Sequence, residues 1–305
     1  MNNNGKKYFQ FSQYLKNKFG EKVYKVTLDG GFSCPNRDGT ISTGGCIFCD
    51  DGGSFSQSCD KFLSVKEQIK IGIEQQHKRY GANKFIGYLQ AFSNTYKPVN
   101  ELKKIYDDVF CDKRIIGISI GTRPDCIDNE KLSFISSYQD DYEVWLEYGL
   151  QSIHDKTLKL INRGHNYECF EKAYELTKKY RIKVCTHIIL GLPNETKEDM
   201  IKTAKKLAEL EVDGVKFHCL CLLKNSPLMS CKDFKPMDED DYVDIICDFL
   251  EILPKNTTIH RLAANGKNDK LIAPLWLKKR FATINKIDKE LERRKSFQGI
   301  NYKKY

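Results

Sequence analysis

Three cysteines in one glycine-rich segment have the types and the spacing that hold an iron–sulfur cluster. Eleven residues separate Cys34 from Cys46, and two separate Cys46 from Cys49. Thiolates are the usual ligands of these clusters, and a Cys-x-x-Cys pair brings two sulfurs to neighbouring irons from one tight loop. Three protein ligands leave one iron of a [4Fe-4S] cluster open. An open iron can bind the amino and carboxylate groups of S-adenosylmethionine (SAM), which one-electron transfer cleaves to a 5'-deoxyadenosyl radical.

Two other interpretations fit the same cysteines. A structural zinc ion needs a fourth ligand, for which Cys59 is the nearest candidate, and unrelated buried thiols need none. Against zinc, the sequence lacks the second Cys-x-x-Cys pair of a zinc site built from two knuckles. Phe48, inside the run CIFC, also offers an aromatic ring that suits adenine. The cluster is therefore the leading hypothesis and zinc is its rival.

Composition fits a protein that keeps its thiols reduced. The 305-residue chain contains twelve cysteines, and no stretch approaches the roughly twenty apolar residues of a membrane span. The N-terminal segment lacks the apolar region of a signal peptide. We therefore expect a cytoplasmic protein without membrane contact, in which cysteines are available for metal binding.

Alternating short apolar runs and longer amphipathic stretches predict an α/β fold. The expected strands cover residues 23–29, 84–90, 115–121, 143–151, 183–191 and 214–223, with a possible seventh at 257–262. The expected helices lie near 64–79, 98–110, 129–138, 167–180, 196–210, 238–252 and 275–295, and Asn194 and Asp238 are plausible helix caps. Six βα units suffice for an open barrel. The simplest partition is a helical lead-in at 1–22, a core at 23–255 and a C-terminal strand with a basic helical extension at 256–305.

Several blocks of the chain together resemble the radical SAM superfamily, in particular the bacterial family of the YtqA/YhcC type, also called MnmL-like. These blocks are KVYKVTLDGGFSCPNRDGT, LQAFSNTY, IGTRPDCI, EYGLQSIHDKTLKLINRGH, HIILGLPNET, VDGVKFH and LIAPLWLKK. The resemblance implies a partial (β/α)6 barrel of TIM type with the cluster loop after the first strand. It also implies a [4Fe-4S] cluster ligated by the three cysteines, SAM as cosubstrate, and an electron donor such as flavodoxin or ferredoxin.

The resemblance further implies roles at the SAM site. Ser93 or Asn94 lies where many related enzymes have a Gly-Gly-Glu motif, and either would meet the SAM amino group. Arg163 is placed like an arginine that pairs with the SAM carboxylate, an anion that its planar guanidinium suits. Glu147 and Gln151, near the end of the fourth expected strand, would face the ribose. Glu147 and Gln151 could equally be buried polar residues that tie down a loop, and Arg163 could equally cap a short helix.

Three further residues are candidates for lining the substrate cavity. Arg123 and Asp125 follow the third expected strand, where they either fix a loop or touch substrate. His218 is implied by the resemblance to line the cavity. The carboxyl ends of barrel strands converge on one face, so these side chains are expected near the cysteines.

The substrate is inferred from resemblance alone. The same blocks resemble the radical SAM half of the Elongator catalytic subunit, which modifies C5 of the wobble uridine in tRNA; without an acetyltransferase domain, we expect no acetyl transfer here. The closer family implies conversion of 5-carboxymethylaminomethyluridine to 5-aminomethyluridine, in the biosynthesis of mnm5(s2)U, by hydrogen abstraction from the glycine-derived methylene and fragmentation. Two alternatives stay open: a radical SAM enzyme acting on a small metabolite, and a zinc-stabilised nucleic-acid-binding module without catalysis.

Basic residues crowd the last part of a chain whose net charge is +9. They are Lys278, Lys279, Arg280, Lys286, Lys289, Arg293, Arg294, Lys295, Lys303 and Lys304. Such a segment could bind the phosphates of tRNA. The apolar residues Ile284, Ile287 and Leu291 alternate with these cations, so a solvated amphipathic helix packed on the barrel is the other interpretation.

Overall fold

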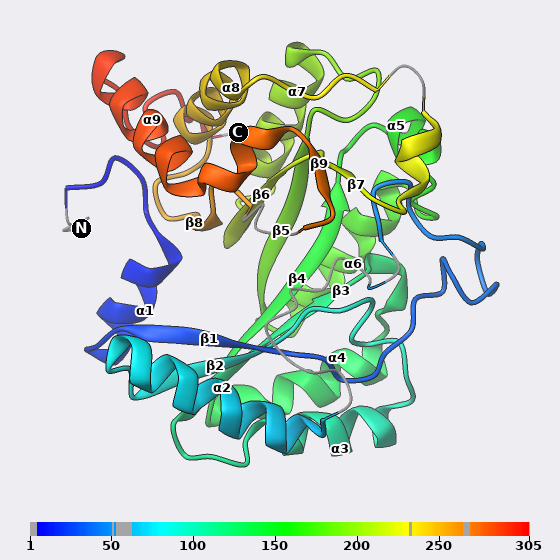
Figure 1. Ribbon diagram of the computed structural model, residues 1–305. Coiled ribbons are helices and arrows are strands. Elements are labelled where there is room, and N and C mark those ends of the chain that lie inside the picture. Colours follow the sequence, from blue (N-terminus) through cyan, green and yellow to red (C-terminus); the bar gives the residue numbers. More distant parts are fainter. Residues whose placement is uncertain (1–4, 51, 53–62, 232–233, 265–268, 305) are drawn as a thin grey trace.

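Seven parallel strands form one curled sheet in a computed structural model that describes residues 5–50, 52, 63–231, 234–264 and 269–304 (Figure 1). The strands lie in chain order: β1 Val23–Leu28, β2 Lys84–Leu89, β3 Ile115–Thr122, β4 Glu143–Gln151, β5 Lys183–Leu190, β6 Gly214–Cys219 and β8 Thr258–Arg261. The sheet is a half-barrel, which confirms the expected α/β barrel fold. Cys59, the candidate fourth zinc ligand, lies outside the described residues.

Helices connect the strands and cover the outer face of the sheet. They are α2 Val65–Tyr80, α3 Val99–Val109, α4 Asn129–Ser136, α5 Asp155–Leu160, α6 Tyr167–Lys179, α7 Lys197–Glu209 and α8 Glu239–Ile252, with 3-10 turns η1 Pro124–Cys126, η2 Ser137–Asp140 and η3 Pro227–Ser230. The cap expected at Asn194 is wrong. Thr196 caps α7 in a reciprocal box with Asp199, while Asn194 lies in the preceding turn with a φ of 63°. Asp238 precedes α8, but its side chain makes no capping bond.

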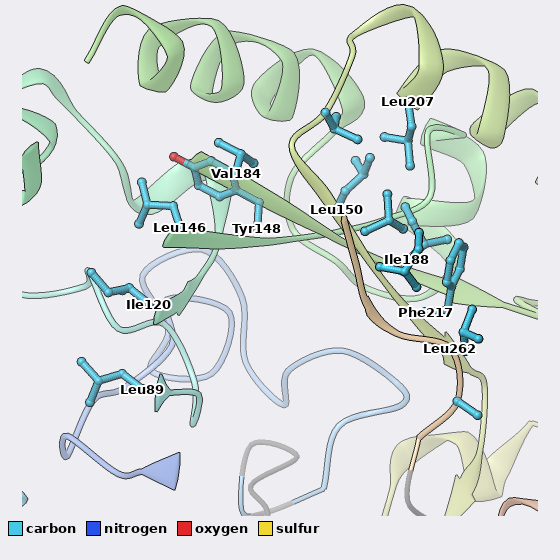
Figure 2. Close-up of a cluster of buried hydrophobic side chains, with 14 of the residues drawn as sticks. Leu89, Ile120, Leu146, Tyr148, Leu150, Val184, Ile188, Leu207, Phe217 and Leu262 are labelled. Carbon is cyan, nitrogen blue, oxygen red and sulfur yellow. The ribbon is translucent and has the colours of Figure 1, made fainter. Parts of the chain in front are cut away.

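The core lies between the sheet and its helices (Figure 2). Leu146, Tyr148 and Leu150 alternate along β4 and are fully buried in this layer, where Val184 and Ile188 of β5 join them. Successive strand residues point to opposite faces, so the intervening residues of β4 point into the barrel. Each buried large side chain contributes about 1.5–3 kcal/mol relative to exposure. This outer layer therefore supplies much of the stability and leaves the interior available for polar groups.

Helix α1, Phe11–Phe19, covers the amino-terminal end of the barrel. Phe11 and Leu15 pack against Trp145 and Cys185, which point inward near the starts of β4 and β5. Just before this helix, Gln10 forms a parallel bridge with Ile259 of β8, so the lead-in also covers the exposed edge of the sheet. Apolar side chains thus fill the amino-terminal end of the barrel.

Three expectations for the C-terminal half need correction or refinement. The strand expected at 214–223 is wrong as a single unit, because β6 ends at Cys219 and the separate β7, Leu222–Leu223, pairs with β9, Leu271–Ala273. The possible strand at 257–262 is β8, which pairs parallel with β6 inside the main sheet. The helix expected at 275–295 starts as the 3-10 turn η4, Leu275–Lys279, and continues as α9, Arg280–Arg293.

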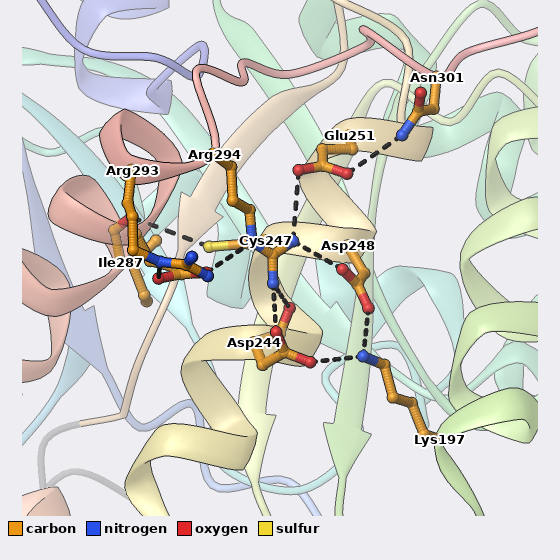
Figure 3. Close-up of polar contacts among 10 residues, drawn as sticks. Lys197, Asp244, Cys247, Asp248, Glu251, Ile287, Arg293, Arg294 and Asn301 are labelled. Carbon is orange, nitrogen blue, oxygen red and sulfur yellow. Dashed lines mark hydrogen bonds and ion pairs between the residues drawn. The ribbon is translucent and has the colours of Figure 1, made fainter.

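Ion pairs fasten the C-terminal helix to its neighbour (Figure 3). Arg294 donates to Asp248 at 2.7 Å, to Glu251 at 3.3 Å and to Asp244, all on α8. Lys286 pairs with Glu239 at 2.6 Å. These cations are neutralised within the protein. Among the described residues, no helix is long and apolar enough to cross a membrane.

Candidate active site

A cavity of about 640 Å³ lies at the carboxyl ends of the strands. Every strand of the main sheet contributes to its wall, through Thr27, Tyr88, Gly121, Gln151, Ile189, His218 and Arg261. The loop after β1 supplies a further part of the wall, including the three candidate cluster ligands, and the segments after β6 and β8 supply more of it. This end of a parallel barrel is where catalytic residues usually gather.

Cys34, Cys46 and Cys49 all line this cavity. A tight turn brings the second pair together, with the amide nitrogen of Cys49 donating to the carbonyl of Cys46 at 2.9 Å. Two thiolates on one zinc ion lie about 3.8 Å apart, given a Zn–S bond of about 2.3 Å and tetrahedral angles. Within the described residues, one group of three potential metal ligands has all its ligand atoms within 4.8 Å of one another. That group is Glu147, Cys185 and His187, and it does not include these cysteines. At least one pair of their sulfurs is therefore farther apart than two thiolates on one zinc ion.

Arg163 joins the cysteine loop to the end of β4. Its Nη1 lies 3.6 Å from the sulfur of Cys46, and its Nε and Nη2 donate to the carbonyl of Gly149 at 3.1 and 2.7 Å. Asn36 also donates to the Cys46 sulfur, at 3.6 Å. Hydrogen bonds of this kind to a ligating sulfur raise the reduction potential of a cluster. The structure thus places Arg163 beside an expected cluster ligand, while its pairing with the SAM carboxylate stays a prediction.

Arg123 and Asp125 hold the segment that carries Arg163. The guanidinium of Arg123 donates to both carboxylate oxygens of Asp125, at 2.8 and 2.5 Å, and to the carbonyl of Arg163 at 2.8 Å. Burial opposes its charge, but Asp125 outweighs burial and raises the pKa of Arg123. Arg123 lines the cavity and Asp125 is not part of its wall. Of the two roles considered for this pair, fixing a loop is the one that the contacts display.

Ser93 and Asn94 turn away from the cavity. Both are fully buried, with the hydroxyl of Ser93 3.0 Å from that of Thr122 and Nδ2 of Asn94 donating to the carbonyl of Gly121 at 2.7 Å. From the same segment, Gln90 and Phe92 line the cavity instead. Contact of Ser93 or Asn94 with the SAM amino group stays a prediction, and the missed residues of this segment are the two that face the cavity.

Gln151 and Phe48 have the environment expected of a nucleoside site. Gln151 ends β4 with a φ of 76°, a conformation that is strained for any residue except glycine. Its Oε1 is buried without a hydrogen-bond partner among the described residues, so the cavity offers an acceptor for a ligand hydroxyl. Phe48 lines the same cavity and packs against the apolar cluster that includes Leu158 and Ile161. These features fit adenosine.

Glu147 is the centre of a polar layer deeper in the barrel, here called the cavity floor. Its carboxylate accepts from Lys25 and Ser119, both at 2.5 Å, from His187 at 2.7 Å and from Lys216 at 2.8 Å. Burial alone would raise the pKa of Glu147, but the charges of Lys216 and Lys25 hold it well below its usual range. Because all these donors come from the protein, the geometry gives Glu147 a part in building the floor, and its contact with ribose stays a prediction.

The other members of the floor were not predicted from the sequence. They are Lys25, Tyr88, Ser119, His187, Lys216 and Arg261, one from each remaining strand. Most of them alternate with buried apolar residues, so each polar side chain points inward. A lysine inside an apolar strand, as in VYKVTL and GVKFHC, was the available signal. The charge of such a lysine shows that the position is unusual for a strand, but it does not show which side chain the lysine contacts.

Comparison with protein families gives two matches that together span most of the chain. The model described as "Radical SAM superfamily" matches residues 38–207, and the model described as "Radical_SAM C-terminal domain" matches residues 212–293. YtqA of Bacillus subtilis (strain 168) is 39% identical over 300 residues, covering 97% of this chain and 93% of its own. Protein YhcC of Escherichia coli (strain K12) is 36% identical over 285 residues, covering 92% and 91%.

Two more distant relatives match this chain over only part of their own length. A tRNA uridine(34) acetyltransferase of Methanocaldococcus infernus is 28% identical over 165 residues, covering 52% of this chain and 30% of its own. The solved structure of archaeal Methanocaldococcus infernus Elp3 superposes with a TM-score of 0.66 at 19% identity, covering 90% of this chain and 64% of that one. At this identity the superposition supports the fold alone.

Proposed function

The chain belongs to the radical SAM superfamily, in the family of YtqA and YhcC, and on that premise we propose that it modifies the wobble uridine of tRNA through a 5'-deoxyadenosyl radical. Members of this superfamily use a [4Fe-4S] cluster and SAM. The observation that carries the proposal is the convergence of Cys34, Cys46, Cys49 and Arg163 on one wall of the cavity. An electron donor such as flavodoxin or ferredoxin is part of the proposal.

The residues of the cavity have separable tasks in this proposal. When bound, the cluster and SAM supply the electron and the adenosyl group from which the radical forms. Cys34, Cys46 and Cys49 hold the cluster, and Arg163 donates toward the Cys46 sulfur. Gln151 and the ring of Phe48 hold the adenosine. The apolar cluster that fills the amino-terminal end of the barrel helps to exclude water from the radical.

The proposed reaction converts 5-carboxymethylaminomethyluridine to 5-aminomethyluridine. SAM would supply the hydrogen acceptor, which takes one hydrogen atom from the methylene between nitrogen and carboxylate and ends as 5'-deoxyadenosine. The oxidation would be completed by returning one electron to the cluster that Cys34, Cys46 and Cys49 would hold, and hydrolysis of the resulting imine would release the primary amine and glyoxylate. The similarity to a tRNA uridine(34) acetyltransferase over about half of this chain supports a wobble uridine as the substrate.

A surface at the cavity mouth supports an RNA partner. Leu277 and Arg280 line the cavity, and the neighbouring Lys278, Lys279 and Phe281 are exposed, with 71% of Phe281 accessible. No carboxylate among the described residues pairs with these cations. We call residues 278–281 the rim patch. An exposed ring next to unpaired cations suits a base and the phosphates beside it.

Analysis of tRNA from cells with and without the gene tests the proposal. Loss of the gene should cause 5-carboxymethylaminomethyluridine to accumulate at the wobble position, as measured by nucleoside mass spectrometry. Unchanged wobble nucleosides would contradict the tRNA substrate and favour a small metabolite. Anaerobic reconstitution tests the chemistry: Cys49→Ser should abolish formation of 5'-deoxyadenosine, whereas Cys111→Ser, at an exposed position, should not. Zinc retention without a brown chromophore would favour the zinc-binding module.

A further inference from the structure

The cavity floor carries more positive charge than its carboxylate balances. Glu147 is the one acidic residue of the floor as the described residues define it, and both Lys25 and Lys216 pair with it, at 2.5 and 2.8 Å. Arg261 also faces the cavity, but no carboxylate in the described part of the chain lies within ion-pair distance of it. Its hydrogen bonds go to the carbonyl of Phe217 and to the ring of His218. A partly buried guanidinium without an anion is unfavourable unless a ligand supplies one.

A bulge in the sheet brings the unpaired arginine beside a second cation. Gly214 and Val215 of β6 pair with Thr258 and Ile259, but Lys216 pairs with Arg261 because the register shifts by one residue. Without this shift Arg261 would point to the other face of the sheet, since successive strand residues alternate. Like charges directly opposite each other on neighbouring strands repel. The bulge therefore places Lys216 and Arg261 where their positive charges repel each other. An anion bound between the two side chains would remove this repulsion.

The other polar groups near this pair do not supply the missing negative charge. Burial and the charge of Lys216 lower the pKa of His187 to about 4, and burial with Arg261 lowers that of His218, so both rings are neutral at pH 7. The hydroxyl of Tyr88 accepts from Lys216 at 2.6 Å, and burial with the charge of Glu147 raises the pKa of Tyr88. The floor thus keeps its excess positive charge at neutral pH.

We propose that Lys216 and Arg261 form a binding site for a carboxylate of the substrate. The guanidinium fork pairs with both oxygens of a carboxylate, and the ammonium adds a second charge. The carboxylate of SAM is a poor occupant, because the residues that would hold the cluster and SAM gather at the cysteine wall, where Arg163 reaches Cys46. The identification of the anion as the carboxymethyl group of the wobble nucleoside rests on the proposed function. Anchoring this group fixes the methylene next to it.

Equilibrium binding to the reconstituted holoenzyme tests the site. The probes are two anticodon stem–loops that differ only at the wobble base, which is 5-carboxymethylaminomethyluridine in one and 5-aminomethyluridine in the other. The wild-type protein should bind the carboxylated RNA roughly tenfold more tightly. Arg261→Gln and Lys216→Met should each reduce this preference to within about twofold, and Arg261→Lys should restore part of it. Lys205→Gln, at an exposed position of α7, should retain the full preference.

Each result has one interpretation. The hydrogen bonds of Lys216 and Arg261 go to other residues of the floor and to Phe217 and His218, so all variants should keep the iron absorbance of the wild type. A preference that survives in both Arg261→Gln and Lys216→Met overturns the proposal. Variants that lose SAM binding but keep the preference overturn it too, and assign the pair to the SAM carboxylate. If the wild type binds both RNAs equally, the carboxylate site is overturned but the proposed function is not. If the wild type binds neither RNA, the proposed function is contradicted as well.

Discussion

Nη1 of Arg163 lies 3.6 Å from the sulfur of Cys46, although 117 positions separate the two residues in the chain. Donation to this sulfur stabilises the more negative, reduced state of a cluster. Arg163→Met should therefore lower the midpoint potential of the reconstituted cluster by on the order of tens of millivolts. Redox titration followed by electron paramagnetic resonance measures this shift. Arg79→Met, on the outer helix α2, is the control, and equal potentials in both variants would show that Arg163 does not act on the cluster.

The glycine after Arg163 is required for the cysteine loop to pack closely. A Cβ at Gly164 would lie 2.4 Å from Oδ1 of Asn36, and φ there is +79°. Gly164→Ala should lower the free energy of unfolding by roughly 2–4 kcal/mol, from strain plus the clash. Gly81→Ala separates the two causes, because φ there is +64° and nothing lies near the added Cβ. We expect that control to lose only about 1 kcal/mol in urea denaturation. Equal losses would refute the steric explanation.

Substrate binding should weaken in alkali because of Lys216. Burial lowers the pKa of Lys216 to about 8, partly offset by Glu147. Only the protonated amine attracts a carboxylate, so kcat/KM for the carboxylated tRNA should fall as pH rises through about 8. The sign for folding is opposite: the unfolded chain keeps this proton up to about 10.5, so Lys216 contributes increasing stability between these values. In Lys216→Met the decline of kcat/KM near pH 8 should be absent, and its persistence there would assign the titration to another group.

The rim patch should determine how RNA affinity depends on salt. Replacing Lys278 and Lys279 by Gln should reduce the slope of log affinity against log salt by up to about 1.5, if each contacts one phosphate. Phe281→Ala should weaken binding by about 1–3 kcal/mol with little change in that slope, because stacking is less sensitive to salt. Lys295→Gln, beyond the end of α9, is the matched control. An unchanged slope in the double variant would place the RNA elsewhere.

Two adjacent arginines at the end of α9 should differ in their effect on stability. Arg294 contacts four carboxylates and its side chain is 16% exposed, whereas Arg293 pairs with Glu290 alone and is 73% exposed. Arg294→Met leaves Glu251 without its counter-charge and Asp244 and Asp248 with Lys197 as their remaining one, and should cost about 2–3 kcal/mol. Arg293→Met should cost less than about 0.5 kcal/mol. Urea denaturation measures both, and similar losses would contradict the structural role of Arg294.

The sequence by itself determined the elements and the cluster loop. Periodicity located the strands to within about a residue at most ends, because apolar alternation is a local property of the chain. The cysteines could be recognised for the same reason, since all three lie in one short segment. The strand expected at 214–223 shows the limit: its apolar character continues past Cys219, but pairing with β5 stops there and Leu222 turns to β9.

Only the tertiary structure decided which charges meet. Lys25, Glu147 and Lys216 lie far apart in the chain, and they come together because strand register aligns their inward positions. Whether Arg261 faces the cavity depends on a shift of one residue between β6 and β8, which no local pattern encodes. Likewise, ten basic residues near the C-terminus formed one group in the sequence. Folding neutralises Arg294 against α8 and leaves the rim patch unpaired, because helix packing, unlike composition, assigns each cation its neighbours.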